Sequence, residues 1–122
     1  MTINNFHVSN DIRNKLKLDT STSFYKVQNW DTVPNKKFDR VLYYFEENDN
    51  EEIVMKNLKN ISSPGALILV CGIPQINKRL SNGELKENKD VLPTVLNENG
   101  IERFWFLSAK LDHLFDLLAE VK

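Results

Sequence analysis

The hydrophobic pattern along this chain is dominated by two short runs in which every residue is apolar or aromatic, residues 41–45 and 66–71. Such uninterrupted runs are typical of strands that are covered on both faces of a sheet. Between them, Val54, Leu58 and Ile61 recur at spacings of four and three, which predicts an amphipathic helix. A strand, a helix and a second strand in this order predict a βαβ unit whose two strands are parallel neighbours at the centre of one sheet.

The ends of this unit carry residues that are typical of helix starts and turns. Asn48 is a candidate N-cap, and Glu51 follows it three residues later, as in a capping box. Acidic residues come early in the helical segment and lysines come late, which suits the helix dipole. Pro64 and Gly65 then predict a turn into the second strand.

The chain before this unit is more polar. Val8, Ile12 and Leu16 recur every four residues and predict a short helix with one buried stripe. Residues 24–28 have the β-propensity of a short strand, and residues 30–37 contain the Asp, Pro and Asn that are typical of turns. We expect the short helix to lie against a face or an edge of the sheet.

The chain after the second apolar run predicts a loop, a helix and a strand. Residues 75–89 show little periodicity and predict a long loop. Asp90 is a candidate cap of a helix that runs to Asn99 and has Pro93 in its first turn. Residues 101–107 then predict a strand with three consecutive aromatic residues.

The last segment fits two different structures. High helix propensity and an apolar stripe favour a helix over residues 110–122, and a helix is our prediction. The stripe consists of Leu111, Leu114, Phe115, Leu118 and Val121. The alternative is a strand that carries on one side Phe115, Leu117, Ala119 and Val121.

Together these elements predict an α/β fold, namely a three-layer, Rossmann-like sandwich with a small, mostly parallel sheet. A chain of 122 residues is long enough for one domain, and 41% hydrophobic residues can fill its core. We therefore expect residues 1–122 to form a single domain.

Charge and cysteine content indicate which classes of partner and which cellular compartment to expect. The chain has 16 Lys and Arg against 17 Asp and Glu, a net charge of −1, without the basic excess that is typical of nucleic-acid-binding proteins. Cys71 is the only cysteine, so no intramolecular disulfide can form and a reduced compartment is expected. No stretch approaches the roughly 18 apolar residues of a membrane span, and the N-terminus lacks the pattern of a signal peptide. We expect a soluble, cytoplasmic protein that binds neither nucleic acid nor membranes.

Part of the chain resembles a known enzyme family. Asp31 follows a short strand, Phe38, Asp39 and Val41 form a Phe-Asp-x-Val motif at the start of the next strand, and a Pro-Gly turn opens the strand after it. In this order the motifs resemble the later half of class I S-adenosylmethionine-dependent methyltransferases. The resemblance implies a Rossmann-like sheet, with the cofactor pocket beside Asp31.

The resemblance covers residues 25–72, and the chain departs from the family at the cofactor loop. Methyltransferases and dinucleotide-binding enzymes need a glycine-rich turn after their first strand, because only a bare backbone lets the ligand approach the amides. The first glycine of this chain is Gly65. We therefore predict a degenerate or truncated domain of this type that binds no cofactor. A similar half-sized sheet occurs as the structural subdomain of polyketide ketoreductases.

The acidic side chains near the predicted strand ends have two interpretations. Asp31, Asp39 and Glu46 are the candidate residues of a reduced, methyltransferase-like crevice, although Asp39 also fits a structural role in a turn. Glu46, Glu47 and Asp49 follow the strand at the end where open α/β sheets bind ligands. They fit either a cation site or the start of a helix, and we favour the helix start.

The other candidates for catalysis have structural explanations. Cys71 lies in an apolar run, so we expect a core residue rather than a nucleophile. His7 and His113 stand far apart in the sequence, without a nucleophile motif, so no catalytic triad is predicted. We therefore predict no catalytic residues and no metal site.

Protein binding is the function that these observations favour. Phe104, Trp105 and Phe106 form the candidate interface, because a strand sends consecutive side chains to both faces and an edge position would leave aromatic surface available. We expect a non-catalytic module, a pseudoenzyme, that binds a protein partner or another copy of itself. Two alternatives stay open. One is a small-molecule-binding protein or enzyme with the reduced crevice, and the other is a structural subdomain of a larger enzyme such as a polyketide ketoreductase.

Overall fold

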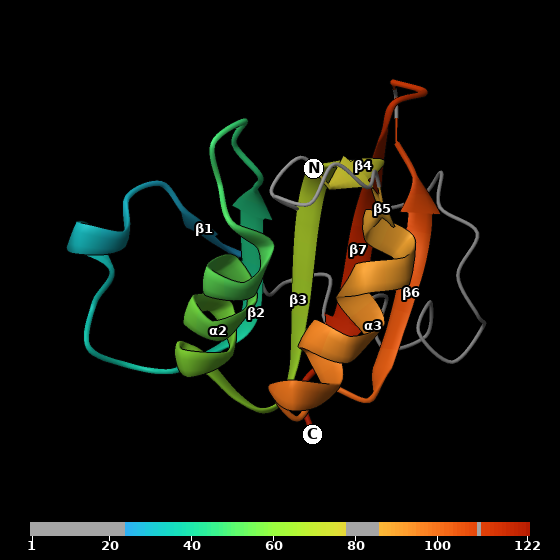
Figure 1. Ribbon diagram of the computed structural model, residues 1–122. Helices are drawn as coiled ribbons and strands as arrows, with labels where there is room; N and C mark the ends of the chain where they lie inside the picture. The colour runs from blue at the N-terminus through green and yellow to red at the C-terminus, as the bar shows by residue number, and fades with distance from the viewer. Residues whose placement is uncertain (1–23, 78–85, 110) are drawn as a thin grey trace.

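The computed structural model describes residues 24–77, 86–109 and 111–122, and its main feature is a mixed sheet of five strands in the order β1-β2-β3-β7-β6 (Figure 1). The strands of this sheet are β1 (Tyr25–Val27), β2 (Phe38–Tyr44), β3 (Ser62–Pro74), β6 (Arg103–Ser108) and β7 (Leu114–Glu120). The other described elements are the helices α2 (Glu51–Asn60) and α3 (Asn88–Glu98), the 3-10 helix η1 (Trp30–Thr32), and a small sheet of β4 (Ile76–Asn77) and β5 (Lys86–Glu87).

The predicted βαβ unit is confirmed. β2 and β3 pair in parallel, with Val41 opposite Ile68 and Tyr43 opposite Val70, and α2 connects them. Neither strand lies at an edge, because β1 pairs in parallel with β2 and β7 pairs with β3. The uninterrupted apolar runs thus occupy interior strands. In β2 the side chains of Val41, Leu42 and Tyr43 are buried and that of Tyr44 is exposed, whereas residues 66–71 of β3 are all buried.

Helix α2 begins later than its predicted cap. Asn50, not Asn48, is the N-cap, and its side-chain oxygen accepts hydrogen bonds from the backbone N–H groups of Glu52 (3.0 Å) and Ile53 (3.3 Å). The segment before α2 contains three residues that can cap a helix, and the pattern alone did not distinguish them. The acidic first turn and the lysine in the last turn are present as predicted.

The last segment is a strand, so the predicted helix over residues 110–122 is wrong. β7 lies between β3 and β6 and runs antiparallel to both. Residues 115–119 are all buried, whereas an amphipathic helix would expose one side. Helix propensity is overridden here because β7 satisfies the backbone groups of two neighbouring strands. The structure has the alternative arrangement, in which one face of the strand carries Phe115, Leu117, Ala119 and Val121.

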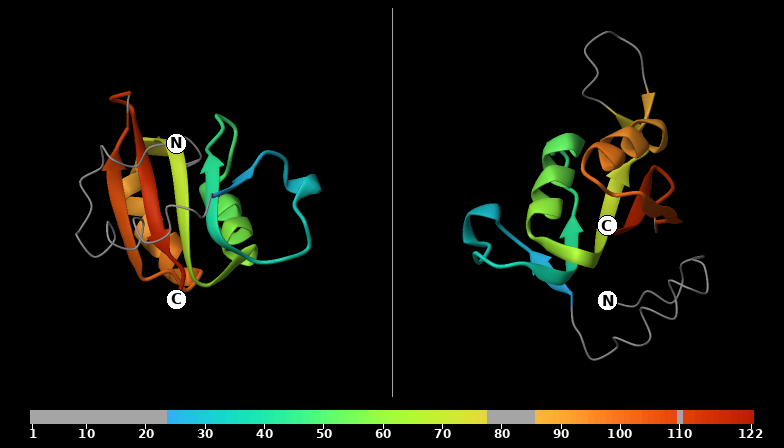
Figure 2. Two further views of the ribbon diagram at one scale, coloured as in Figure 1. Left: turned by 180° about the vertical axis from the view of Figure 1, so that it is seen from behind. Right: turned by 90° about the horizontal axis from the view of Figure 1, so that it is seen from below.

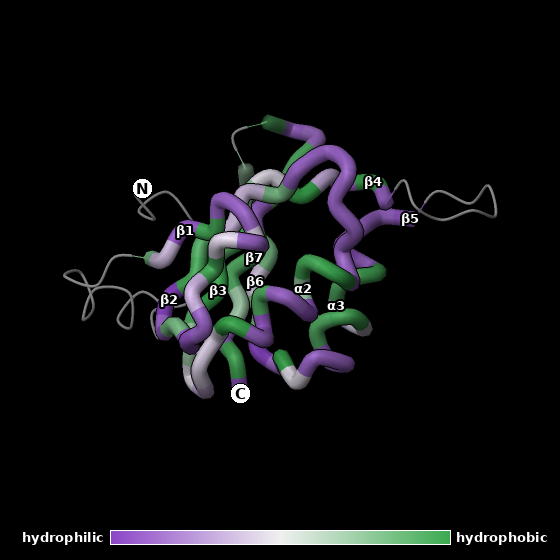
Figure 3. Tube along the Cα trace, turned by 90° about the vertical axis from the view of Figure 1, so that its left-hand side faces the viewer, coloured by the Kyte–Doolittle hydropathy of each residue, from purple (hydrophilic) through white to green (hydrophobic). Residues whose placement is uncertain are grey.

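The predicted three-layer, Rossmann-like sandwich is also wrong. Strands make up 44% of the structure, the sheet is mixed, and both described helices lie on one side of it (Figure 1, Figure 3). Seen from behind, the strands of the sheet lie in front of these helices (Figure 2). A three-layer sandwich of this kind needs helices on both faces of the sheet. Here α2 and α3 both pack on one face, and β7 runs antiparallel between β3 and β6.

The predicted loop over residues 75–89 contains regular structure at both ends. Ile76 pairs with Glu87 and Asn77 with Lys86 in the two-stranded sheet of β4 and β5, while residues 78–85 lie outside the described part. This ladder leads directly into α3, which begins at Asn88 without a side-chain cap instead of after Asp90. Pro93 consequently lies in the second turn of the helix rather than the first.

Buried side chains form two clusters, one on each side of the sheet. The side covered by α2 and α3 is named the first face, and there Ile68 and Leu117 pack with Leu58 and Leu96 of the helices. The opposite side is named the second face. Its smaller cluster consists of Leu42, Leu69, Cys71, Leu107 and Leu118, with Phe24 and Trp105 packed against it.

The predictions for the beginning of the chain concern a strand, a turn and a short helix. The strand over residues 24–28 is present as β1, and η1 lies within the predicted turn over residues 30–37. The helix predicted from Val8, Ile12 and Leu16 lies outside the described residues. Among the helices of the described part, none has the length and apolar character needed to cross a membrane.

Candidate functional site

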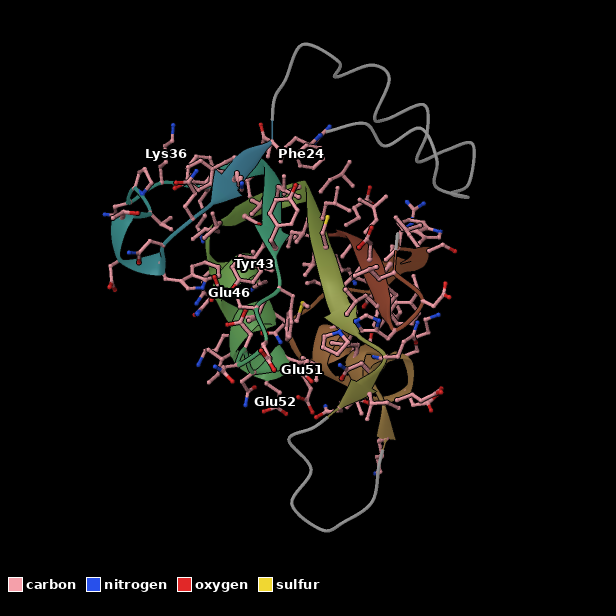
Figure 4. All side chains as sticks on the ribbon, turned by 90° about the horizontal axis from the view of Figure 1, so that it is seen from above. Phe24, Lys36, Tyr43, Glu46, Glu51 and Glu52 are labelled. Atoms are coloured by element: carbon pink, nitrogen blue, oxygen red, sulfur yellow. The ribbon has the colours of Figure 1, made fainter. Side chains whose placement is uncertain are left out.

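A cleft lies at the carboxyl ends of β2 and β3, where open α/β sheets commonly bind ligands. Its volume of about 240 Å³ is below the roughly 300 to 1,000 Å³ of most small-molecule sites. The lining includes Phe45, Glu47, Asn48 and Asp49 after β2, Glu51 of α2, and Pro74 of β3. Figure 4 looks down on this end of the sheet and shows further carboxylates there, those of Glu46 and Glu52. A cleft with this lining disfavours anionic ligands, which include the phosphates of nucleotides.

Asp49 is held by a hydrogen-bonded turn beside this cleft. The Tyr43 hydroxyl donates to its Oδ2 at 2.5 Å, and the backbone N–H of Glu46 donates to the same oxygen at 2.8 Å. Burial, and then the hydrogen bond and charge of Asp49, raise the pKa of Tyr43 far above its ordinary value. The phenol therefore stays protonated at neutral pH, where it fixes the turn between β2 and α2 rather than serving as a general base.

The acidic residues after β2 lack the arrangement of a metal centre. Across residues 24–77, 86–109 and 111–122, there is no group of three or more His, Cys, Asp or Glu side chains placed to hold a metal ion. Glu51 and Glu52 lie in the first turn of α2, where negative charge is favourable. His113 is exposed in the connection between β6 and β7, and His7 lies outside the described residues.

The three candidate crevice carboxylates do not come together. Asp39 is the second residue of β2, and its carboxylate accepts a hydrogen bond from the Ser63 hydroxyl. Glu46 follows the opposite end of the strand, and at roughly 3.3 Å per residue the length of β2 places about 16 Å between Asp39 and Tyr44. Asp31 lies in η1, where its backbone N–H donates to the Asn29 side chain at 2.9 Å. Asp39 thus binds the start of β3, at the end of the sheet away from the cleft.

Cys71 is a core thiol. Only 8% of the residue is exposed, and it packs on the second face. Burial, followed by the nearby charge of Asp116, raises the pKa of Cys71 to about 12. Because the thiolate is the reactive form, a thiol with this pKa is a poor nucleophile at neutral pH.

Asp116 is a buried acidic residue that the sequence pattern did not single out. It lies in the middle of β7 with 7% of its surface exposed, and its Oδ1 accepts a hydrogen bond from the backbone N–H of Gly72 at 3.0 Å. Burial raises the pKa of Asp116, and the bond from Gly72 opposes this shift. The sequence contained a signal for this residue, because Asp116 is the single Asp within the apolar segment LFDLLA. The predicted helix would have placed its side chain in solvent, so the signal was not recognised.

The aromatic residues of the candidate interface lie on β6, an edge strand of the sheet. Phe104 and Phe106 pack against the first-face cluster, where the ring of Phe106 meets that of Phe115 edge-on with their centroids 5.3 Å apart. Trp105 packs against the second-face cluster, with the Arg103 guanidinium 5.4 Å from its ring centroid. All three aromatic residues are half-buried, so part of each ring remains accessible.

Comparison with known proteins assigns this chain to no family. No protein-family model matches it, and no curated protein is significantly similar to it. The resemblance to the later half of class I methyltransferases stays a prediction, whereas the Rossmann-like sandwich that it implied is not the observed fold.

Proposed function

We propose that this chain is a non-catalytic module that binds another protein through the edge of β6. The observation that carries the proposal is the place of β6 at the end of the sheet, where it pairs with β7 and with no other strand of the described residues. An edge strand presents N–H and C=O groups to which an extended protein segment can add as a further strand.

The hydrogen-bond ladder indicates which backbone groups of β6 face outward. Val121 donates its N–H to a carbonyl of β3 at 2.9 Å, so its backbone polar groups face β3. Because this direction alternates along a strand, the groups of Leu118 face β6 and meet its register partner Trp105. The backbone groups of Phe104 and Phe106, on either side of Trp105, therefore point away from the sheet.

The two edges of the sheet differ in their suitability for strand addition. β1 has three residues, and the middle one is Lys26. Short edge strands and lysines are devices that discourage pairing with another chain. β6 has six residues, contains neither Lys nor Pro, and carries three aromatic side chains. Aromatic residues are enriched at protein interfaces, so β6 is the edge better suited to a partner.

The matched variants Phe106→Ala and Phe106→Pro test this function. Both remove the ring, but only Pro also removes the outward-facing N–H. Proteins captured from the native host by the wild-type chain would be purified and titrated calorimetrically against all three forms, with circular dichroism melts as the control for folding. We expect Phe106→Pro to bind about 3- to 10-fold more weakly than Phe106→Ala, the effect of one hydrogen bond. Equal affinity of the two folded variants would contradict binding at this edge.

The cleft motivates a second candidate function, the binding of a small molecule. Its lining carboxylates and small volume are unfavourable for S-adenosylmethionine and NAD, and the chain has no glycine before Gly65. We therefore expect either ligand at millimolar concentration to leave the melting temperature unchanged, since a ligand stabilises a protein only by binding its native state. A shift of several degrees that Glu47→Ala, a substitution in the lining of the cleft, abolishes would support the small-molecule function instead.

A further inference from the structure

We propose that the strand added to β6 is the β6 strand of a second copy of this chain, related by a twofold axis that passes between the two Trp105 residues. This inference rests on the proposed function of the β6 edge and specifies its partner. A twofold axis perpendicular to the sheet makes the two β6 strands antiparallel and keeps the first faces of both copies on the same side. The two sheets then join into one continuous sheet with the helices of both copies on one side.

The alternation of side chains restricts the register of this pair. Residues opposite each other in an antiparallel pair point to the same face of the sheet. Phe104 and Phe106 share the first face, so each can lie opposite the other in the second copy, and Trp105 then lies opposite its own equivalent. The same register joins the outward-facing backbone groups of Phe104 to those of Phe106 in the second copy, once on each side of the axis.

The neighbouring registers lose these aromatic pairs. An axis at Phe106 would place Phe104 opposite Ser108, whose side chain offers little apolar surface. An axis at Phe104 would place Arg103 opposite Trp105. Only the axis at Trp105 gives aromatic partners to all three aromatic residues, and aromatic cross-strand pairs are among the favourable ones.

The charges along β6 are compatible with this self-association. With the axis at Trp105, Arg103 lies opposite Leu107 of the second copy, so no like charges face each other within the strand. Arg103 already has an ionic partner in its own chain, Glu120, at 3.1 Å. The net charge of −1 adds little repulsion between two copies.

Sedimentation equilibrium of the full chain over a concentration series tests the dimer. We expect a species of twice 14.2 kDa that dissociates on dilution. Phe106→Pro should raise the dimer dissociation constant about tenfold or more relative to Phe106→Ala, because the substitution removes one hydrogen bond on each side of the axis. A monomer at every concentration up to the millimolar range would overturn the proposal, and so would a dimer equally stable in both variants.

Disulfide trapping tests the register. In this arrangement Trp105→Cys places two thiols at a pair whose Cα atoms are about 4.5 Å apart, within disulfide range. Phe104→Cys is the control, because its side chain lies opposite Phe106 rather than opposite itself. We expect mild oxidation to cross-link Trp105→Cys and not Phe104→Cys, with the buried Cys71 present in both. Cross-linking of the control alone, or of neither variant, would overturn this register.

The outcomes separate this proposal from the function on which it rests. A monomeric chain whose binding of a different protein is weakened by Phe106→Pro would refute the second copy and support the proposed function. A chain that neither dimerises nor binds any partner at β6 would refute both.

Discussion

The parallel half of the sheet, β1-β2-β3, and its antiparallel half, β3-β7-β6, share one strand but differ in how they are connected. In the parallel half, α2 links β2 to β3 and packs on the strands that it connects. In the antiparallel half, β7 is the last strand of the chain, yet it lies between two strands that precede it. The pairs β2–β3 and β6–β7 each join strands that are near in sequence, whereas β3–β7 joins distant strands, with Ile68 opposite Ala119.

Each half has a register shift, at a different place along its ladder. The β2–β3 ladder shifts at its start, between Phe38 and Arg40, and then runs without interruption to Tyr44. Between β3 and β7 the register shifts after Val70, and there Gly72 adopts a φ of +79° and donates its N–H to Asp116. A side chain of β7 thus completes a ladder that the backbone alone leaves irregular.

The largest expected effect concerns the strand that both halves share. Leu69 in β3 is 0% exposed and belongs to the second-face cluster. Leu69→Ala should lower the free energy of unfolding by about 2 to 5 kcal/mol, because apolar transfer and a residual cavity both contribute. Chemical denaturation measures the change, and a loss below about 1 kcal/mol would contradict the burial of this strand.

The next prediction compares neighbouring residues of β7. Leu117 and Leu118 are both 0% exposed, on opposite faces of one strand. We expect Leu117→Ala to lower the free energy of unfolding by about 2 to 5 kcal/mol. Leu118→Ala should lower it somewhat less, but by more than about 1 kcal/mol, because the cluster around Leu118 is smaller. Urea denaturation of both variants measures this. A near-zero effect at either position would point to an amphipathic helix, which exposes one of two neighbours.

A smaller effect is expected at the register shift. Gly72 has a positive φ, and an added Cβ would approach Leu114 Cδ1 only to 4.0 Å, an ordinary contact. Gly72→Ala should therefore destabilise through backbone strain alone, by about 1 to 2 kcal/mol. Gly72→Asn is the matched control and should lose less, since Asn tolerates this conformation better. Equal thermal stability of wild type and Gly72→Ala would show that the register shift does not require a glycine at this position.

The smallest effect depends on pH. Burial raises the pKa of Asp116 above its ordinary value of 3.8, so the folded protein disfavours the carboxylate. This effect lowers the stability of the fold. The loss is absent at a pH below the pKa of Asp116 in the unfolded chain and is complete at a pH above its pKa in the folded protein. Asp116→Asn, whose side-chain oxygen can still accept from Gly72, should raise the melting temperature at pH 7, with a gain that shrinks as the pH falls toward 4.

An exposed residue of the β6–β7 connection provides the control for this pH effect. Asp112→Asn should leave the melting temperature unchanged at both pH values, because Asp112 is exposed. If Asp116→Asn lowered the melting temperature at pH 7 as well as at pH 4, the charge of Asp116 would be stabilising, contrary to our account.

The candidate site was predicted in composition but not in position. The aromatic run at Phe104 to Phe106 is visible in the sequence, and its residues divide between the two faces as strand alternation requires. β6 lies at an edge because β7 is inserted between it and β3, and no local sequence pattern predicted this insertion. The crevice at Asp31, Asp39 and Glu46 could not be judged from sequence spacing either, since Asp39 lies near the start of β2 and Glu46 follows its other end.

The sequence by itself determined the parallel pair of β2 and β3 and the helix between them. Uninterrupted apolar runs are typical of strands buried on both faces, and the apolar residues of α2 recur with the period of a helix. The segment LFDLLAE satisfies both the helical and the strand period, so its own residues do not decide between them. The tertiary structure decided, because β3 and β6 each present backbone groups that a strand between them can satisfy and a helix cannot.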